Sequence, residues 1–392
     1  MLSKKLDQVT PSYTIEISTK VNELKNEGMD IINLSIGEPD FFTPKQAQNK
    51  GIEAIYNNRT KYDAAAGLKE LRKAIQDKLR EENNVHYDLD EIVVSSGAKH
   101  SITNTLIALL DPGDEVIIPK PFWVSYSEMI KMTSGIPVLV ETDKNNDFKI
   151  TAEELENAIS TKTKLLLINN PSNPTGAIYT KDELKSIIKV CLDNNVYILA
   201  DEIYEKICYA DNFTSIASLS KEAKEITITI NGLSKSAAMT GWRIGYSASS
   251  KKIAKAISTI QGHLVSHPST ISQWTAYGAL TLCGDEMKKM VGIYKERRDK
   301  AVRLLSKIDN ISFINPQGAF YIFIDISAFK NKFNYRDSYS VEFCKRFLEN
   351  YNVAIVPGIA FGIDDYVRIV YCADINDVLE GIRRLEEFIQ SL

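Results

Sequence analysis

Short β-rich runs alternate with helical segments across the middle of the chain, and this alternation constrains the fold more than any other feature. The runs cover residues 91–95, 115–119, 136–141, 164–169, 196–201, 226–231 and 242–248. Strands separated by helices are typical of βαβ units, which build a largely parallel sheet. The sequence therefore predicts an α/β fold with a mostly parallel seven-stranded sheet flanked by helices.

Two of the intervening helices have well-defined starts. The segments Thr151-Ala-Glu-Glu154 and Thr180-Lys-Asp-Glu183 match the capping box. In this motif the hydroxyl and the carboxylate satisfy backbone amides of the first helical turn that have no intrahelical partner. Helices are therefore expected to begin directly after Thr151 and Thr180.

The pattern changes after about residue 280. A long charged helix is expected over 285–307, followed by short strands near 311–324 and 353–356 and a closing helix from 376 onward. A chain of 392 residues also exceeds the size at which a single hydrophobic core stops growing. We predict a large domain over 46–280 and a smaller α+β domain formed by 1–45 and 281–392.

Composition narrows the class of partner. The net charge of −4 is spread along the chain, without the basic patch that binds nucleic acid or an anionic membrane. No apolar run is long enough to span a bilayer, and the N-terminus lacks the apolar stretch of a signal peptide. The five cysteines are widely spaced, which favours reduced thiols and no metal site. We expect a cytoplasmic protein that acts on small molecules.

Lys235 and Asp201 each follow or end a β-rich run. Ligands of open parallel sheets gather beyond the carboxyl ends of the strands, so both side chains are expected at one crevice. An aldehyde cofactor with a phosphate tail needs a lysine for an imine, a carboxylate for a ring nitrogen, and groups such as Ser234 and Arg243 for the phosphate. Alone, a Ser-Lys pair is usually a solvated surface charge, and Asp201 would suit a helix cap.

Three further segments support a site at this edge of the sheet. Tyr204 follows Asp201 closely enough to face the same ligand and donate to a phenolic oxygen. The segment Asn173-Pro-Thr-Gly176 has turn chemistry directly after a predicted strand. The loop 95–100 leads from a strand into an apolar helix expected over 101–110, whose first amides can hold a phosphate. Taken singly, each segment is also compatible with an ordinary turn or loop.

Together these motifs resemble class I aminotransferases of the type I pyridoxal phosphate fold, in particular the bacterial aspartate aminotransferase branch. The resemblance covers nearly the whole chain and keeps the family's order of motifs. It rests on 36–40 (IGEPD), 61–62 (KY), 111–114 (DPGD), 121–126 (PFWVSY), 173–176 (NPTG), 201–204 (DEIY), 231–235 (NGLSK), 239–243 (MTGWR) and 367–369 (VRI).

The resemblance implies pyridoxal 5′-phosphate as cofactor and assigns roles to individual residues. The catalytic residues would be Lys235 as the imine-forming lysine, Asp201 beside the ring nitrogen, and Tyr204 beside the ring hydroxyl. The other cofactor contacts would come from Asn173, Trp123, Gly97, Ala98, Lys99, Ser234, Arg243 and, from a neighbouring subunit, Tyr62. The substrate contacts would come from Arg368, Gly37, Trp123, Asn173 and Lys99. A homodimer with shared active sites is implied.

The expected reaction is amino transfer from L-aspartate to 2-oxoglutarate by a ping-pong mechanism. Residues 261–275 lack the arginine with which vertebrate-type relatives read the distal acid, whereas Lys99 matches a lysine of the bacterial branch. Aromatic residues such as Phe41 and Phe42 keep an aromatic or broad-specificity aminotransferase open as an alternative. A β-lyase acting on cysteine-type substrates is another alternative. A ligand-sensing module is a non-enzyme reading, but the chain shows no helix-turn-helix or basic patch.

Overall fold

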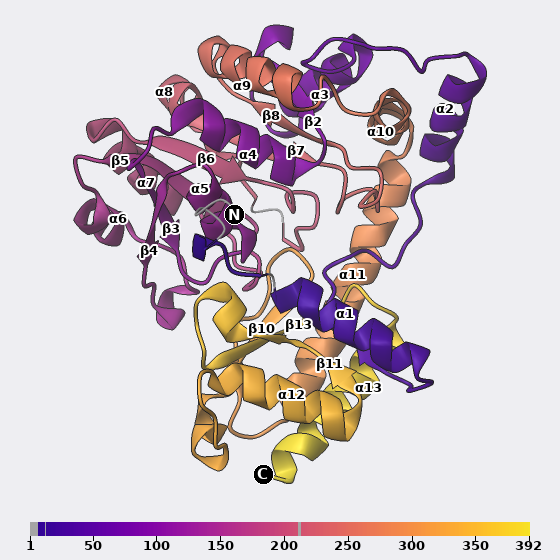
Figure 1. Cartoon of the computed structure of the whole chain (residues 1–392), viewed down its shortest axis with the longest axis vertical. Helices are drawn as coiled ribbons and strands as arrows, with labels where there is room; N and C mark the ends of the chain where they lie inside the picture. Colours follow the sequence, from indigo (N-terminus) through magenta and orange to yellow (C-terminus); the bar gives the residue numbers. More distant parts are fainter. Residues whose placement is uncertain (1–6, 12, 211–212) are drawn as a thin grey trace.

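A seven-stranded sheet forms the centre of the larger part of the molecule, as the computed structural model of the chain shows (Figure 1). The structure describes residues 7–11, 13–210 and 213–392. The strand order is β2-β8-β7-β6-β5-β3-β4. The strands are β2 (Ile92–Ser95), β3 (Glu115–Pro119), β4 (Ile136–Val140), β5 (Thr163–Asn169), β6 (Tyr197–Asp201), β7 (Thr227–Gly232) and β8 (Gly245–Ala248). Only β8 pairs antiparallel with its neighbours β2 and β7.

This sheet confirms the predicted mostly parallel α/β fold, and the seven predicted runs match its strands closely. The largest difference is β8, which was expected from residue 242 but begins at Gly245. Arg243 adopts φ of 56°, in the left-handed region, so the backbone turns there and cannot continue an extended strand. Both capping boxes are also confirmed, because Thr151 and Thr180 accept the backbone N–H of Glu154 and Glu183.

Helices cover both faces of the sheet because its central strands are apolar on both sides. Along β5, Leu165 and Leu167 pack in one cluster, whereas Leu166 and Ile168 pack in another. The first cluster includes α4 (Ala98–Leu109), α5 (Ser125–Met132) and α9 (Lys251–Leu264). The second includes α6 (Ala152–Ala158), α7 (Lys181–Asp193) and the start of α8 (Lys221–Ile226). A third cluster joins β2 and β8 to α2 (Lys45–Tyr56), α3 (Lys69–Glu82) and α10 (Thr270–Leu282).

The smaller part of the molecule has its own sheet and core. Its four strands run in the order β12 (Val356–Pro357), β13 (Tyr366–Val370), β10 (Tyr321–Asp325) and β9 (Ser312–Phe313). The helices α12 (Tyr339–Tyr351) and α13 (Ile375–Gln390) pack beside it, and α11 (Gly284–Leu305) runs from the larger part down to them (Figure 1).

The N-terminal region lies with the C-terminal elements. The strand β1 (Ile32–Asn33) pairs in parallel with β11 (Val353–Ala354), and α1 (Tyr13–Asn26) contacts β12. This pairing places the residues after β1 between the two parts of the molecule. The exact domain boundaries at 46 and 280 stay a prediction. Within the described residues, no helix combines the length and apolar character that crossing a bilayer requires.

Candidate active site

A cleft of about 530 Å³ opens at the carboxyl ends of the parallel strands, where the larger sheet meets β10 and β13. All the predicted site residues except Gly97 and Tyr62 line it. Its wall consists of Ser18, Thr19, Ser35, Ile36, Gly37, Glu38, Ala98, Lys99, Trp123, Tyr126, Asn169, Asn173, Asp201, Ile203, Tyr204, Ser234, Lys235, Thr240, Arg243, Tyr321 and Arg368. Residues far apart in the sequence thus share one cavity.

Asp201 ends β6 and is buried at the floor of the cleft. Its Oδ2 accepts a hydrogen bond of 2.6 Å from the Tyr126 hydroxyl, and its Oδ1 accepts the Ile203 N–H at 3.2 Å. Burial raises the pKa of Asp201 to about 6, although these donors and the nearby Lys235 oppose the shift. A buried carboxylate that is ionised near neutral pH is well suited to hold a cationic group of a ligand.

Lys235 lies three residues beyond β7 and points toward the segment after β1. Its Nζ donates a 2.6 Å hydrogen bond to the carbonyl oxygen of Gly37. Burial lowers the pKa of Lys235 to about 8, with smaller effects from Cys372 and Glu38 in the opposite direction. A fraction of this amine is therefore neutral at physiological pH, which makes it a better nucleophile than an ordinary lysine.

Arg368 of β13 is the buried cation on the opposite wall. Its Nη1 donates to the Asn173 Oδ1 at 3.1 Å, and its Nη2 donates to the Ser35 carbonyl at 2.6 Å. The guanidinium carbon lies 4.4 Å from the centre of the Tyr321 ring. Burial lowers the pKa of Arg368, but a guanidinium remains charged at any physiological pH. Among the described residues its Nε–H has no partner, which leaves one donor for an anion.

The loop before α4 forms one end of the cleft. The helix begins at Ala98, three residues earlier than predicted, and Gly97 caps it with φ of 90°. A Cβ at Gly97 would lie 2.5 Å from the Arg243 Nη2, and one at Gly245 would overlap the Ala98 amide. The glycines thus let a guanidinium and the amides of a helix N-terminus approach each other, an arrangement that binds phosphate.

Lys99 and Trp123 lie at the side of the cleft. The Lys99 Nζ is 4.8 Å from the centre of the Trp123 ring. Desolvation and the positive charge of Arg243 lower the pKa of Lys99. Among the described residues no carboxylate pairs with Lys99 in an ion pair, and Ser18 and Thr19 of α1 line the same cavity.

Tyr62 is the predicted residue that the chain does not bring to its own cleft. Its side chain is 89% exposed and meets His267 edge to face, with ring centres 5.8 Å apart. This side chain was predicted to reach the active site of a neighbouring subunit. A single chain does not contain that contact, so the role of Tyr62 stays a prediction.

Comparison with known proteins identifies the family. Residues 29–385 match the family model described as aminotransferase class I and II. The chain belongs to this family. It is 42% identical to an aspartate aminotransferase of Bacillus sp. (strain YM-2), over 100% of this chain and 99% of the relative. It is 41% identical to a probable aspartate/prephenate aminotransferase of Aquifex aeolicus, over 100% of this chain and 99% of that protein.

Solved structures agree with this assignment. An aspartate aminotransferase from Rhizobium meliloti superposes with a TM-score of 0.94 at 38% identity, covering 99% of this chain and 98% of the other. The Thermus thermophilus aspartate aminotransferase with maleate gives a TM-score of 0.92 at 35% identity, covering 99% of both chains. The protein is therefore a pyridoxal phosphate-dependent aminotransferase with the type I fold.

The aminotransferase cleft fits this cofactor chemically. Asp201 offers a buried carboxylate for the ring nitrogen, and Lys235 offers an amine of lowered pKa for the aldehyde. Among the described residues, the backbone N–H groups of Ala98 and Lys99 at the start of α4 have no partner, and they lie beside Arg243, as a phosphate requires. The Nε–H of Arg368 has no partner among the described residues, which suits a carboxylate of the substrate.

Two tyrosines of the cleft were missed as site residues at the sequence level. Tyr126 is the last residue of the family motif at 121–126. Nothing in the sequence shows that its hydroxyl reaches Asp201, 75 residues further along the chain. Tyr321 lies on β10, and its hydroxyl is 2.7 Å from that of Tyr204. Only the packing of the two sheets creates this contact, so no local motif could have revealed it.

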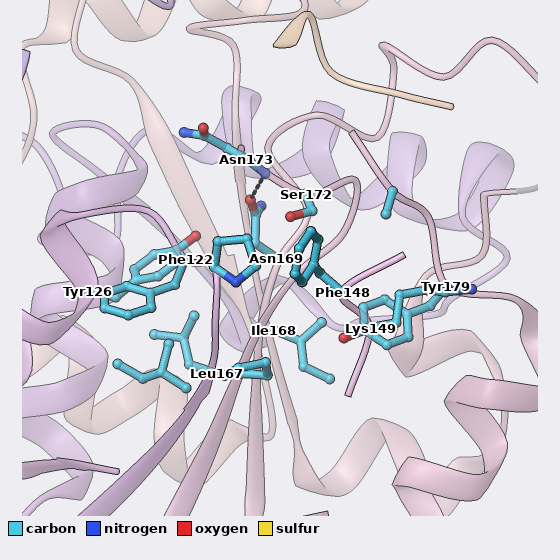
Figure 2. A pocket seen from close by; sticks show the side chains of 14 residues that line it. Phe122, Tyr126, Phe148, Lys149, Leu167, Ile168, Asn169, Ser172, Asn173 and Tyr179 are labelled. Carbon is cyan, nitrogen blue, oxygen red and sulfur yellow. Dashed lines mark hydrogen bonds between the residues drawn. The ribbon is translucent and has the colours of Figure 1, made fainter. Parts of the chain in front are cut away.

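A smaller cavity of about 30 Å³ shares Tyr126, Asn169 and Asn173 with the cleft, and Figure 2 labels these three residues. The backbone N–H of Asn173 donates to the Asn169 Oδ1 at 2.7 Å, and the Asn169 Nδ2 donates to the Asp201 carbonyl at 2.9 Å. These bonds tie the turn at Asn173 to the end of β6. Asn169, the last residue of β5, was not among the predicted site residues.

Proposed function

We propose that this aminotransferase moves the amino group of L-aspartate to 2-oxoglutarate in two half-reactions, with oxaloacetate leaving before 2-oxoglutarate enters. The observation that carries this proposal is the pair of cations in one cleft, Arg368 and Lys99. Both substrates are dicarboxylates, so they need one cation for each acid group. Arg368 has a donor without a protein partner for the α-carboxylate, and Lys99 suits the distal acid.

The proposed mechanism assigns a proton or a charge to each group. Bound pyridoxal phosphate supplies the sink for the electron pair released from the α-carbon. Lys235 would take the α-proton of the substrate on its Nζ and would pass it to the cofactor. Asp201 keeps the ring nitrogen protonated, and Tyr204 with Asn173 donates to the ring oxygen. Arg368 holds the α-carboxylate so that the α-hydrogen faces Lys235.

The remaining predicted site residues are proposed to bind and orient the cofactor and the substrate. The backbone N–H groups of Ala98 and Lys99 are proposed to hold the phosphate together with Ser234, the Gly97 loop and Arg243, which leaves the Lys99 ammonium for the distal acid. Trp123 is proposed to stack on the ring, and the backbone N–H of Gly37 to assist Arg368. Ser18 and Thr19 line the same cavity as Lys99, and their hydroxyls are proposed to donate to the distal acid. The Thermus relative was solved with maleate, a dicarboxylate, which supports this view of the substrate.

A substitution at Lys99 tests the substrate assignment. A charged hydrogen bond contributes about 1.5 to 3 kcal/mol, so Lys99→Met should weaken kcat/KM for aspartate by roughly 10- to 150-fold. Activity with tyrosine should change far less, because an aromatic side chain needs no cation. Lys235→Ala lacks the imine-forming lysine, so its rate gives the background of the assay. Equal losses for aspartate and tyrosine, or wild-type preference for tyrosine, would refute the dicarboxylate assignment. Pyruvate and sulfide release from cysteine without an oxo acid would favour the β-lyase instead.

A second acceptor is worth testing because several relatives carry the name probable aspartate/prephenate aminotransferase. Prephenate is itself a dicarboxylic 2-oxo acid, so the same two cations can hold it. The assay follows aspartate consumption with either 2-oxoglutarate or prephenate as acceptor. A kcat/KM for prephenate far below that for 2-oxoglutarate would restrict the enzyme to the simpler acceptor.

We further propose that the enzyme is a cytoplasmic homodimer with shared active sites. Support comes from α2 and the segment after it, which present exposed side chains at Ile55, Tyr56 and Tyr62, with exposed fractions of 51%, 81% and 89%. Large apolar side chains exposed together often mark a contact with another chain. In the dimer, Tyr62 would donate to the phosphate bound by the other subunit.

Mixed dimers test the sharing of sites. A Lys235→Ala subunit paired with a Tyr62→Ala subunit contains one site with both defects and one site with neither. When the two variants are mixed under conditions in which subunits exchange, the activity should therefore rise well above the sum of the activities of the separate variants. No gain on mixing, or a monomer in sedimentation, would contradict the shared-site dimer.

A further inference from the structure

Tyr321 lies between the two groups that the proposed function treats separately, the ring contacts of the cofactor and the carboxylate clamp of the substrate. Its side chain is buried and lines the cleft. Its hydroxyl is 2.7 Å from the Tyr204 hydroxyl, and its ring centre is 4.4 Å from the Arg368 guanidinium carbon. A Cβ on Gly37 would overlap the Tyr321 hydroxyl, so the glycine leaves room for it.

We propose that Tyr321 is a positioning residue that serves both halves of the site: its hydroxyl directs the Tyr204 proton toward the cofactor ring, and its ring fixes the orientation of Arg368. This inference rests on the proposed function and deepens it. The two roles use different atoms of one side chain, which allows them to be separated by substitution.

The hydroxyl role follows from the number of protons in the pair. Tyr204 and Tyr321 share two hydroxyl protons between two oxygens 2.7 Å apart. If Tyr204 donates its proton to a ligand oxygen, the bond between the tyrosines requires Tyr321 to donate to Tyr204. A donated hydrogen bond polarises the Tyr204 hydroxyl and strengthens its own donation. Without the Tyr321 hydroxyl, Tyr204 donates more weakly and is freer to rotate.

The ring role follows from the surroundings of Arg368. Two of its nitrogens are fixed by Asn173 and by the Ser35 carbonyl. The guanidinium also lies 4.4 Å from the Tyr321 ring centre and 5.0 Å from that of Phe361. These aromatic contacts favour one plane of the guanidinium. Among the described residues, Phe361 makes no ring contact with Tyr204. It therefore shares with Tyr321 only the role of orienting Arg368.

The experiment compares Tyr321→Phe with Phe361→Leu and Tyr371→Phe. The cofactor-loaded proteins are titrated in the visible range without substrate, and KM for aspartate is measured separately. A hydrogen bond from Tyr204 to the ring oxygen stabilises the deprotonated form of the bound chromophore. Tyr321→Phe should therefore raise the pKa of that chromophore by about half a unit. It should leave the KM for aspartate within about twofold of wild type, because the ring remains.

The two comparison variants separate the roles. Phe361→Leu should raise the KM for aspartate by about two- to fivefold without moving the chromophore titration. Tyr371 is buried nearby and its hydroxyl donates to the Ala319 carbonyl outside the cleft, so Tyr371→Phe should change neither quantity. Tyr321→Leu should produce both changes together. Thermal unfolding of each variant verifies that it is folded.

Two results would overturn the inference. Tyr321→Phe could titrate like wild type, which would remove the hydroxyl role, or Tyr371→Phe could shift the titration equally, which would make the effect general. A failure of the proposed function looks different: the chromophore titration would still respond to Tyr321, but the wild-type enzyme would not use aspartate.

Discussion

Replacing Tyr126 by phenylalanine removes one hydroxyl and keeps the ring, including its edge-to-face contact with Trp123 at 5.2 Å between ring centres. That hydroxyl donates a 2.6 Å hydrogen bond to Asp201, whose carboxyl is buried. A hydrogen bond to an ionised group contributes about 1.5 to 3 kcal/mol. Since one pKa unit corresponds to about 1.4 kcal/mol, the substitution should raise the pKa of Asp201 by roughly one to two units.

The direction of the effect on cofactor binding follows from this shift. The pKa of Asp201 is already raised to about 6 by burial, so a further rise of one to two units leaves half or more of the carboxyl protonated at pH 7. A protonated carboxyl cannot hold the ring nitrogen as an ion pair. Affinity for pyridoxal phosphate at pH 7 should therefore fall by roughly two- to tenfold in Tyr126→Phe, and less at pH 9.

The assay measures the Kd of pyridoxal phosphate by quenching of tryptophan fluorescence between pH 5.5 and 9. Both proteins carry Lys235→Ala, because titration of the lysine would otherwise add a second pH-dependent step. The loss of affinity on acidification should move to higher pH in the Tyr126→Phe protein, and Tyr371→Phe serves as a matched control for a deleted buried hydroxyl. If the curves of Kd against pH superimposed for the proteins with and without the Tyr126 hydroxyl, the reasoning would be refuted.

Two further predictions concern groups with shifted pKa values. In the cofactor-free protein, Lys235 should react with pyridoxal phosphate faster as the pH rises, and the rate should level off above about 8, because only the neutral amine attacks. The rate is measured by stopped-flow absorbance. A rate independent of pH would exclude the lowered pKa of Lys235. Burial, with the charge of Glu205, raises the pKa of Glu202 to about 8, so this group binds a proton more tightly in the folded than in the unfolded chain. Its ionisation therefore makes stability fall as pH rises from about 4.5 toward 8. Glu202→Gln should flatten that fall in chemical denaturation, and an unchanged pH profile would contradict the assignment.

The sequence determined most of the fold because its signals are local. Alternating apolar runs and two capping boxes specify strands and helix starts through hydrogen bonds and burial within a few residues. Where the prediction of strand limits was least accurate, at β8, the cause is the left-handed backbone at Arg243, which the apolar pattern of residues 242–248 does not reveal. The same turn brings the guanidinium to the Gly97 loop.

The sequence also determined which residues meet in the cleft, because Lys235, Asp201 and Asn173 each stand at the end of a strand or in the loop after it. Parallel strands deliver such residues to one edge of the sheet whatever their separation along the chain. Family motifs then assign the roles. Only the tertiary structure decided how these residues are tuned. Tyr126 contacts Asp201, and Tyr321 contacts Tyr204 and Arg368, although these partners lie 47 to 117 residues apart in the chain. Burial, which moves the pKa of Asp201 and of Lys235 toward neutrality, is a property of the packed cleft, and no local pattern of residues contains it.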